Sequence, residues 1–301
     1  MIKLESKRMS EKYRKKAYPF EHIAVAVSFS SRLLAVLAEA FRLVDTFGSE
    51  KLIIIHIGVW SEEQEHILED KIKQTNSSNR DFVIIHKESK DVEDTILNIC
   101  KERLVDLLII GALRKENIFD YYMGSIARNL SRKAKCSLLM LTEPREEPVP
   151  FERVVVNGIE NPKTLPTIET ALYIADNEGA NEVFVVREVY LPLMDSGLCT
   201  DATDKESDEI KKEYLDEAGT KSDAEIKKIK GFKNILIKKR TIHGKPGYSI
   251  RNFAKNYKSD LLIINSSDKK MGFLDRVFTH DLEHLLSRIP CNLLIVHSRR
   301  N

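Results

Sequence analysis

The chain has 301 residues, enough for about two domains of ordinary size. Its 48 lysines and arginines against 46 aspartates and glutamates give a net charge of +2, which argues against a general binder of nucleic acids or acidic membranes. Apolar residues make up 42% of the chain, so it can bury a core in each of two domains, and disorder is excluded for most of its length.

No apolar run approaches the roughly 18 residues of a membrane span, and the first 16 residues hold no apolar stretch that would serve as a signal peptide. We therefore expect a soluble, cytoplasmic protein with no membrane partner, in which residues 1–19 form a charged tail. The cysteines lie far apart with no CxxC pair, so neither a disulfide framework nor a cysteine zinc site is predicted.

Short β-branched runs alternate with longer amphipathic stretches in the first half. Helices are predicted where apolar residues recur every three or four positions, and buried strands separated by helices predict a parallel sheet covered on both faces. The predicted strands are His22–Val27, Lys51–Ile57, Phe82–His86, Leu107–Ile110 and Ser137–Leu141, and the predicted helices are Arg32–Phe47, Glu62–Gln74, Val92–Lys101 and Ser125–Lys133.

A linker follows, and then the order of elements repeats. Three prolines and three glutamates between Glu143 and Pro150 cannot continue a helix or a central strand, so the domain boundary is predicted at residues 144–150. The strands predicted after it are Arg153–Val156, Glu182–Val189, Asn234–Thr241, Leu261–Ile264 and Asn292–His297.

The two halves are repeats of one another. The run DLLII at 106–110 recurs at 260–264, and the early matches lie 131 residues apart whereas the later ones lie 154 apart. The difference predicts an insertion near residues 190–232, which we expect to be a charged excursion or a solvated helix. The predicted domains are 20–143 and 151–301, with Ser137–Leu141 beside Asn292–Val296 about a pseudo-twofold axis.

The carboxyl ends of the strands are where an open parallel sheet binds ligands. The fourth strand of the first half is followed by Gly111 and Arg114, and nine residues later by Gly124 and Ser125, which open a predicted helix. Glycine lets a phosphate approach the backbone, and a helix N-terminus offers N–H groups and positive potential. The spacing therefore predicts a phosphate site.

At these residues the chain resembles the universal stress protein family, as a tandem member with two domains. Nucleotide-binding members carry Gly, two residues, Gly, nine residues, Gly and then Ser or Thr, and the first half keeps all of these positions except the second glycine, where it has Arg114. The resemblance implies two tandem open-sheet α/β domains, each a five-stranded parallel sheet with helices on both faces. It also implies pairing of the terminal strands, as a pseudo-dimer within the chain or in a homodimer.

The ligand that the resemblance implies is an adenine nucleotide, ATP or AMP with Mg²⁺. Its base would lie at the ends of the first two strands, where Ser28 replaces the family's aspartate, and its phosphates would lie over the glycines. The candidate residues are Val27, Ser28, Ile57, Gly111, Arg114, Gly124, Ser125 and Ile126. In the second half the matching residues are Asn157, Asn265, Asp268, Phe278 and Thr279, without any of the glycines, so at most one site is expected.

Other interpretations stay open at this point. Gly111 and Gly124 would also be required if their turns need a positive φ, and Arg114 would also suit a solvated loop. His280 and His284 stand four apart and are expected to be a surface pair rather than metal ligands. We expect a stress-linked binding or regulatory protein without enzymatic turnover, metal or nucleic-acid partner. The alternative is an interaction scaffold that binds no nucleotide.

Overall fold

The computed structural model describes residues 17–114, 121–159, 161, 163–189, 226, 229, 231–232, 234–266 and 285–297. The expectations for the tail, for most of the insertion and for Asp268, Phe278, Thr279, His280 and His284 fall outside these residues. Within the described ranges, no helix is long and apolar enough to cross a membrane.

The first half contains every strand and helix that the sequence predicts, with ends that differ by a single residue. A short hairpin, β5 with β6, is added between the fourth strand and the last helix. The elements are β1 (His22–Val27), α2 (Leu33–Phe47), β2 (Lys51–Ile57), α3 (Glu62–Thr75), β3 (Phe82–Lys87), α4 (Val92–Glu102), β4 (Leu107–Gly111), β5 (Leu113–Arg114), β6 (Tyr121–Tyr122), α5 (Ser125–Lys133) and β7 (Ser137–Leu141).

The second half repeats this order, and its predicted strands are present within two residues at each end. Its elements are β8 (Val154–Asn157), α6 (Thr164–Glu178), β9 (Glu182–Val189), β10 (Leu236–His243), α9 (Tyr248–Asn256), β11 (Leu261–Asn265) and β12 (Asn292–Val296). Helices α2 and α6 each end at a glycine in the left-handed region, Gly48 with φ 65° and Gly179 with φ 73°, which are 131 residues apart. The repeat thus extends to the helix ends.

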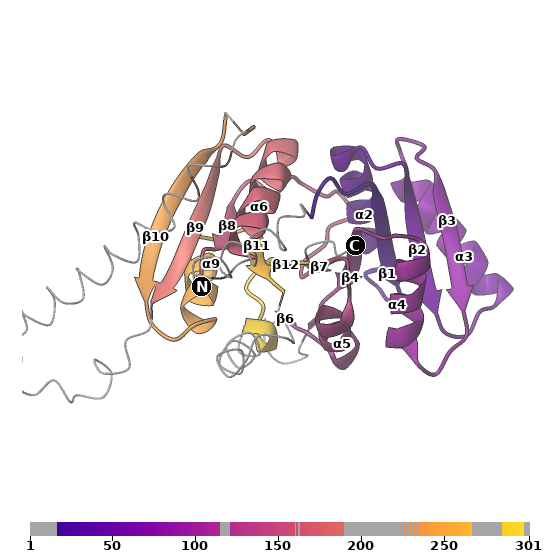
Figure 1. Cartoon of the computed structure of the whole chain (residues 1–301). Coiled ribbons are helices and arrows are strands. Elements are labelled where there is room, and N and C mark those ends of the chain that lie inside the picture. The colour runs from indigo at the N-terminus through magenta and orange to yellow at the C-terminus, as the bar shows by residue number, and fades with distance from the viewer. Residues whose placement is uncertain are drawn as a thin grey trace, which may run out of the picture.

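The ten main strands form one sheet, in the order β10-β9-β8-β11-β12-β7-β4-β1-β2-β3. Within each half the strands are parallel, as predicted, and the halves join where β12 runs antiparallel to β7, with Leu294 opposite Leu139. The prediction that the two terminal strands lie side by side is confirmed. Figure 1 shows this junction in the middle of the molecule, with the indigo and magenta half on one side and the orange half on the other.

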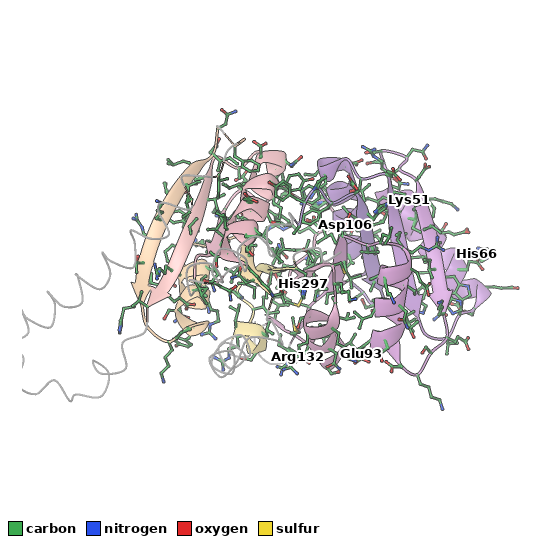
Figure 2. The ribbon with its side chains drawn as sticks, viewed as in Figure 1. Lys51, His66, Glu93, Asp106, Arg132 and His297 are labelled. Atoms are coloured by element: carbon green, nitrogen blue, oxygen red, sulfur yellow. The ribbon has the colours of Figure 1, made fainter. Side chains whose placement is uncertain are left out.

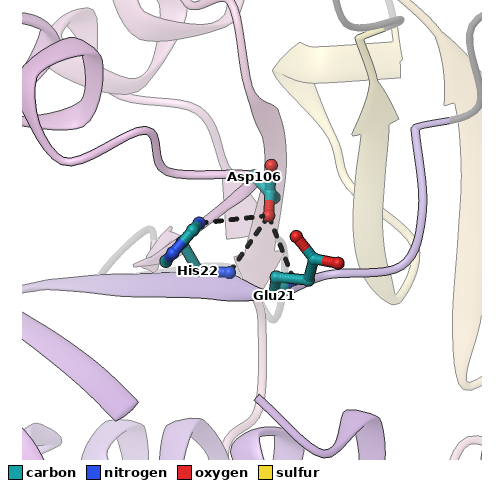
Figure 3. A group of neighbouring side chains, drawn as sticks. All are labelled: Glu21, His22 and Asp106. Atoms are coloured by element: carbon teal, nitrogen blue, oxygen red, sulfur yellow. Dashed lines mark hydrogen bonds and ion pairs between the residues drawn. The ribbon is translucent and has the colours of Figure 1, made fainter. Parts of the chain in front are cut away.

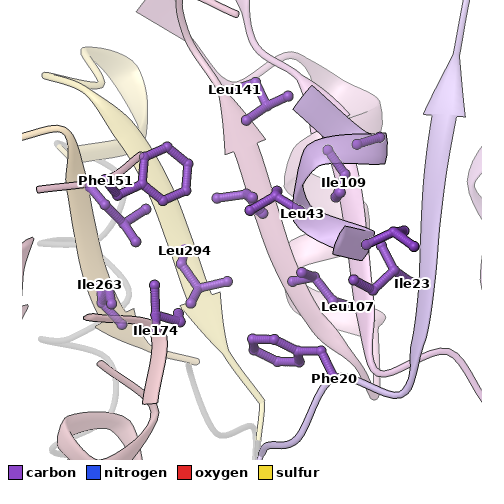
Figure 4. Packing of buried hydrophobic residues seen from close by; sticks show 14 of the residues in the cluster. Phe20, Ile23, Leu43, Leu107, Ile109, Leu141, Phe151, Ile174, Ile263 and Leu294 are labelled. Atoms are coloured by element: carbon purple, nitrogen blue, oxygen red, sulfur yellow. The ribbon is translucent and has the colours of Figure 1, made fainter. Parts of the chain in front are cut away.

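Two apolar layers cover the faces of this sheet. Helices α2, α3 and α6 pack on one face, and α4, α5 and α9 pack on the other, because successive side chains of a strand point to opposite faces. The first layer passes without interruption across the junction: Phe20 and Leu107 of the first half belong to the same cluster as Phe151 and Leu294 of the second (Figure 4). The halves therefore share a core.

Polar contacts at the junction differ on the two sides of the pseudo-twofold axis. Arg42 of α2 donates to Glu178 of α6 at 2.7 and 3.0 Å and to Glu39 at 2.7 and 3.2 Å. The repeat-related pair is Phe47 with Tyr173, whose rings stack at 5.6 Å. One side of the junction thus holds a buried ion pair, and the other side holds an aromatic stack.

The terminal strands are also joined end to end. The backbone N–H of His297, which follows β12, donates to the Ser137 hydroxyl at the start of β7 at 3.3 Å. Figure 2 labels His297 between the two halves. At the other end of the pair, the Asn292 side chain accepts from Thr142 N at 3.0 Å and donates to Asp260 O at 3.0 Å. The register of β7 with β12 is therefore fixed at both ends.

Candidate functional site

A short hairpin brings the two motif glycines of the first half together. Gly111 ends β4 and Gly124 precedes α5, while Leu113 of β5 pairs with Tyr122 of β6 between them. Arg114 lies in β5 and pairs with Tyr121; of Arg114 the structure describes the backbone only. The chain between the glycines thus begins and ends in paired strands.

Neither glycine is required by its backbone conformation. Gly124 has a φ of −66°, and Gly111 is not among the glycines with positive φ. The interpretation that both are kept for turns of positive φ is therefore wrong. A Cβ on Gly111 would meet only Val36 Cγ2, at 3.8 Å, whereas a Cβ on Gly124 would lie 2.6 Å from Leu113 Cδ1, at the end of a half-exposed side chain.

The N-terminus of α5 faces solvent beside these glycines. Gly124 is its N-cap and supplies no side-chain acceptor, so the first N–H groups of the helix are not capped by that residue. Ser125 is exposed, and Ile126 exposes 42% of its surface. Uncapped N–H groups and the helix dipole favour an anion at this position.

A cation that the sequence reading missed lies at the same edge of the sheet. Arg32, the N-cap residue of α2, donates to Ala112 O at 2.6 Å, Leu141 O at 3.2 Å and Thr142 O at 2.6 Å. These carbonyls follow or end strands β4 and β7, so the guanidinium places positive charge at their carboxyl ends.

The repeat contains a signal that could have revealed Arg32. Lys163 stands 131 residues later, and its ammonium donates to Ser266 O and Oγ, each at 2.8 Å. Ser266 in turn stands 154 residues after Ala112, so both offsets of the repeat are kept. Both halves therefore place a cation against the carbonyl that follows the fourth strand.

Four aromatic side chains gather where the resemblance implies a base. Phe29 contacts His56 at 4.9 Å between ring centroids, and Trp60 stacks on His86 at 4.8 Å with an interplanar angle of 20°. His56 Nδ1 lies 3.2 Å from Val27 O. We call Phe29, His56, Trp60 and His86 the aromatic cluster; it follows strands β1, β2 and β3. Of the other candidates at this edge, Ser28 is exposed and Ile57 is half-buried.

One assignment in the second half is corrected by the strand register. Asn157 pairs with Val186 as Ala26 pairs with Ile55, so Asn157 occupies the position of Ala26, and Ile159 stands where the first half has Ser28. The error arose because a loop without a known register can be matched at several positions. The Asn157 side chain instead accepts from the backbone N–H of Ile159 at 3.1 Å.

Asn265, at the end of β11, is the second-half counterpart of Gly111. Its side-chain amide donates to Thr164 Oγ1 at 3.1 Å, so it contacts the start of α6. The polar side chain is thus used inside the protein. Asp268, Phe278 and Thr279 stay sequence predictions.

A cluster at the opposite edge is structural rather than a binding site. Asp106 accepts from the backbone N–H groups of Glu21 and His22, each at 3.0 Å, and lies 3.8 Å from His22 Nδ1 (Figure 3). In the second half Asp260 accepts from the backbone of Arg153 at 2.9 Å and from its guanidinium at 2.6 Å. Because the repeat keeps this contact with arginine in place of histidine, the aspartate serves to join the starts of two neighbouring strands.

Comparisons with known proteins agree with this geometry. Residues 19–142 match the model of the universal stress protein family. A functionally unknown protein from Pseudomonas aeruginosa PAO1 aligns over 95% of this chain and 94% of its own, with 14% identity and a TM-score of 0.65. A universal stress protein from Archaeoglobus fulgidus DSM 4304 aligns over 93% of this chain and 100% of its own, with 11% identity and a TM-score of 0.62.

At these identities the likeness to solved structures establishes the fold alone, and it does so over both halves. The search of curated proteins found no match. The family match covers the half that holds the motif glycines. The chain therefore belongs to the universal stress protein family through its domain at residues 19–142, and a second domain of the same strand order follows it.

Proposed function

We propose that the chain is a cytoplasmic, stress-linked regulatory protein that binds one adenine nucleotide, ATP or AMP, in its first half. The observation that carries the proposal is Gly111. It is exposed, its φ is not positive, and a Cβ there would meet only Val36 at 3.8 Å. Since neither backbone nor packing requires glycine, close approach of a ligand to the backbone is the remaining physical reason for it.

The surrounding groups suit the two ends of such a ligand. The phosphates would lie at the N-terminus of α5 with Ser125, near the positive charge of Arg32, and Mg²⁺ would accompany them in ATP. The base would lie against the aromatic cluster, since aromatic rings offer flat stacking surfaces. Nothing in this arrangement supplies a nucleophile or a general base, so the proposal is binding without turnover.

Trp60 provides the test, because it is the single tryptophan of the chain and belongs to the aromatic cluster. Titration with ATP and Mg²⁺, or with AMP, should change its fluorescence and show one site per chain by calorimetry. Gly124→Phe should abolish binding, and Ser125→Ala should weaken it by about 1.5–3 kcal/mol, as for a hydrogen bond to a charged group. Gly111→Ala should weaken binding without loss of stability.

Ser77→Ala is the matched control, because Ser77 is an exposed serine in the turn before β3, at the opposite edge of the sheet. It should bind nucleotide as the wild type does. Two sites per chain, or equal affinity in wild type and Gly124→Phe, would show that the site is misplaced.

Leu113 favours the second candidate, an interaction scaffold that binds no nucleotide. Its Cδ1 lies 2.6 Å from where a Cβ of Gly124 would be, so it covers the glycine. The absence of heat and of any fluorescence change at millimolar ATP and AMP would support the scaffold and refute the nucleotide proposal.

A further inference from the structure

A cavity of about 360 Å³ lies between the two halves, beside the linker. Thr142 and Phe151 line it from the linker side, and Ser259 and Asn292 line it from the second half. Gly111, Gly124 and Ser125 are not among its lining residues, so it is distinct from the candidate nucleotide site. Its volume falls within the range of small-molecule sites, about 300–1,000 Å³.

Ser259 is an unusual residue for its position. It exposes 7% of its surface, and its hydroxyl has no hydrogen-bond partner among the described residues. The first half builds the same turn from Leu104 and Val105: Leu104 and Lys258 have φ values of 52° and 54°. The N–H groups of Val105 and Ser259 each donate to a carbonyl of the preceding helix at 2.9 Å.

Because the same turn buries an apolar valine in the first half, the fold itself does not need a hydroxyl there. A buried hydroxyl without a partner destabilises the folded state. A ligand in the cavity that accepts a hydrogen bond from Ser259 would remove this cost.

The charges around the cavity favour an anion. The three carboxylates that line it already have partners: Glu39 binds Arg42, Asp260 binds Arg153, and Glu143 accepts from the Tyr121 hydroxyl at 3.1 Å. Neither Arg42 nor Arg153 lines the cavity, so two of the three negative charges are compensated from outside it. The lining cations are Arg145, Arg251, Lys255 and Arg288.

We propose that this cavity binds a small organic phosphate, whose phosphate group accepts from the Ser259 hydroxyl and is held by the cations of α9, Arg251 and Lys255. Arginine, lysine and a hydroxyl together suit a dianion with several acceptor oxygens better than a single carboxylate. The prolines of the linker and Phe151 provide the apolar wall for the organic part. This site is independent of the nucleotide site proposed above.

Such a ligand would contact both halves and the linker at once. Residues 145–147 of the linker are exposed and include Arg145, a bond that trypsin can cut. Occupancy of the cavity should therefore slow tryptic cleavage at Arg145.

Calorimetry with inorganic phosphate and with glycerol 3-phosphate tests the proposal on the full chain. Binding should weaken about tenfold in Lys255→Gln and about tenfold in Ser259→Ala, as expected for loss of one contact to a charged group. Ser259→Ala without ligand should melt at a temperature a few degrees higher than the wild type, because the unpartnered hydroxyl is gone.

Two controls separate this site from its surroundings. Lys258→Gln, an exposed lysine beside Ser259 that does not line the cavity, should bind as the wild type does, and so should Gly124→Phe. No binding at millimolar ligand, or equal affinity in wild type, Lys255→Gln and Ser259→Ala, would overturn the proposal. Loss of phosphate binding in Gly124→Phe alone would assign the anion to the first half and would equally overturn it.

Discussion

Replacement of Arg42 by methionine should destabilise the protein strongly, because it leaves two carboxylates buried at the junction. The side chains of Glu39 and Glu178 expose 6% and 0% of their surface, and Arg42 donates two hydrogen bonds to each. Methionine keeps the length of the side chain and its contact with Phe151, so the change is mainly one of charge. Loss of one partner of a buried ion pair costs about 3–5 kcal/mol.

The pH dependence of this loss follows from the groups that remain. Burial raises the pKa of Glu39 and the nearby Glu178 adds to the rise, whereas Arg42 lowers it. Without Arg42 only the raising causes remain, so a carboxyl group of the folded variant takes up a proton more readily than the unfolded chain does. The variant should therefore regain stability as the pH falls, and the loss should be smaller at pH 5 than at pH 7.

Urea unfolding followed by circular dichroism at both pH values measures this. Arg103→Met, at an exposed arginine that ends α4, is the control and should stay within about 0.5 kcal/mol of the wild type. Adding Glu39→Gln and Glu178→Gln to Arg42→Met should restore part of the loss. A loss below about 1 kcal/mol at pH 7, or an equal loss at both pH values, would refute the reasoning.

Three further changes test other parts of the structure. Because burial raises the pKa of Glu39 above 4.5, its contribution to stability is present below that pH and lost as the pH rises through the folded pKa; Glu39→Gln should flatten the urea midpoints above pH 4.5. Contact with Cys136 and burial raise the pKa of the Cys100 thiol, so iodoacetamide at pH 8 should label Cys100 in urea but not in the folded protein, as read by mass spectrometry. A Cβ on Gly158 would lie 2.7 Å from Val185 Cγ1, so Gly158→Ala should cost about 1–3 kcal/mol in thermal unfolding; a neutral result would show that β9 shifts freely.

The sequence predicts the strands and the helices of this fold because their signals are local. Each buried strand is a run of aliphatic residues, as in Leu107–Gly111, and each helix carries its own apolar period. The junction was also predictable, since two terminal apolar strands such as β7 and β12 would otherwise be left as exposed edges. The hairpin of β5 and β6 escaped because two-residue strands carry no period.

The parts of the site that the sequence did not predict depend on distant contacts. Arg32 looks like a solvated residue before a helix until its acceptors, 80 to 110 residues away in sequence, are known. The aromatic cluster is assembled from the ends of three strands, and no single segment shows it. The cavity beside Ser259 exists only because the two halves and the linker meet there.

The unequal junction has a consequence for self-association of the first half. In a symmetric pair of first halves, Arg42 would face Phe47 of the second copy, because Phe47 stands at the repeat position of Glu178. Two guanidinium groups would then be buried, each without the carboxylate that now crosses the junction. The chain therefore favours its own second half over another copy of the first, and covalent fusion holds that partner at a high effective concentration. A one-to-one ratio of the unlike halves is thus built into every molecule.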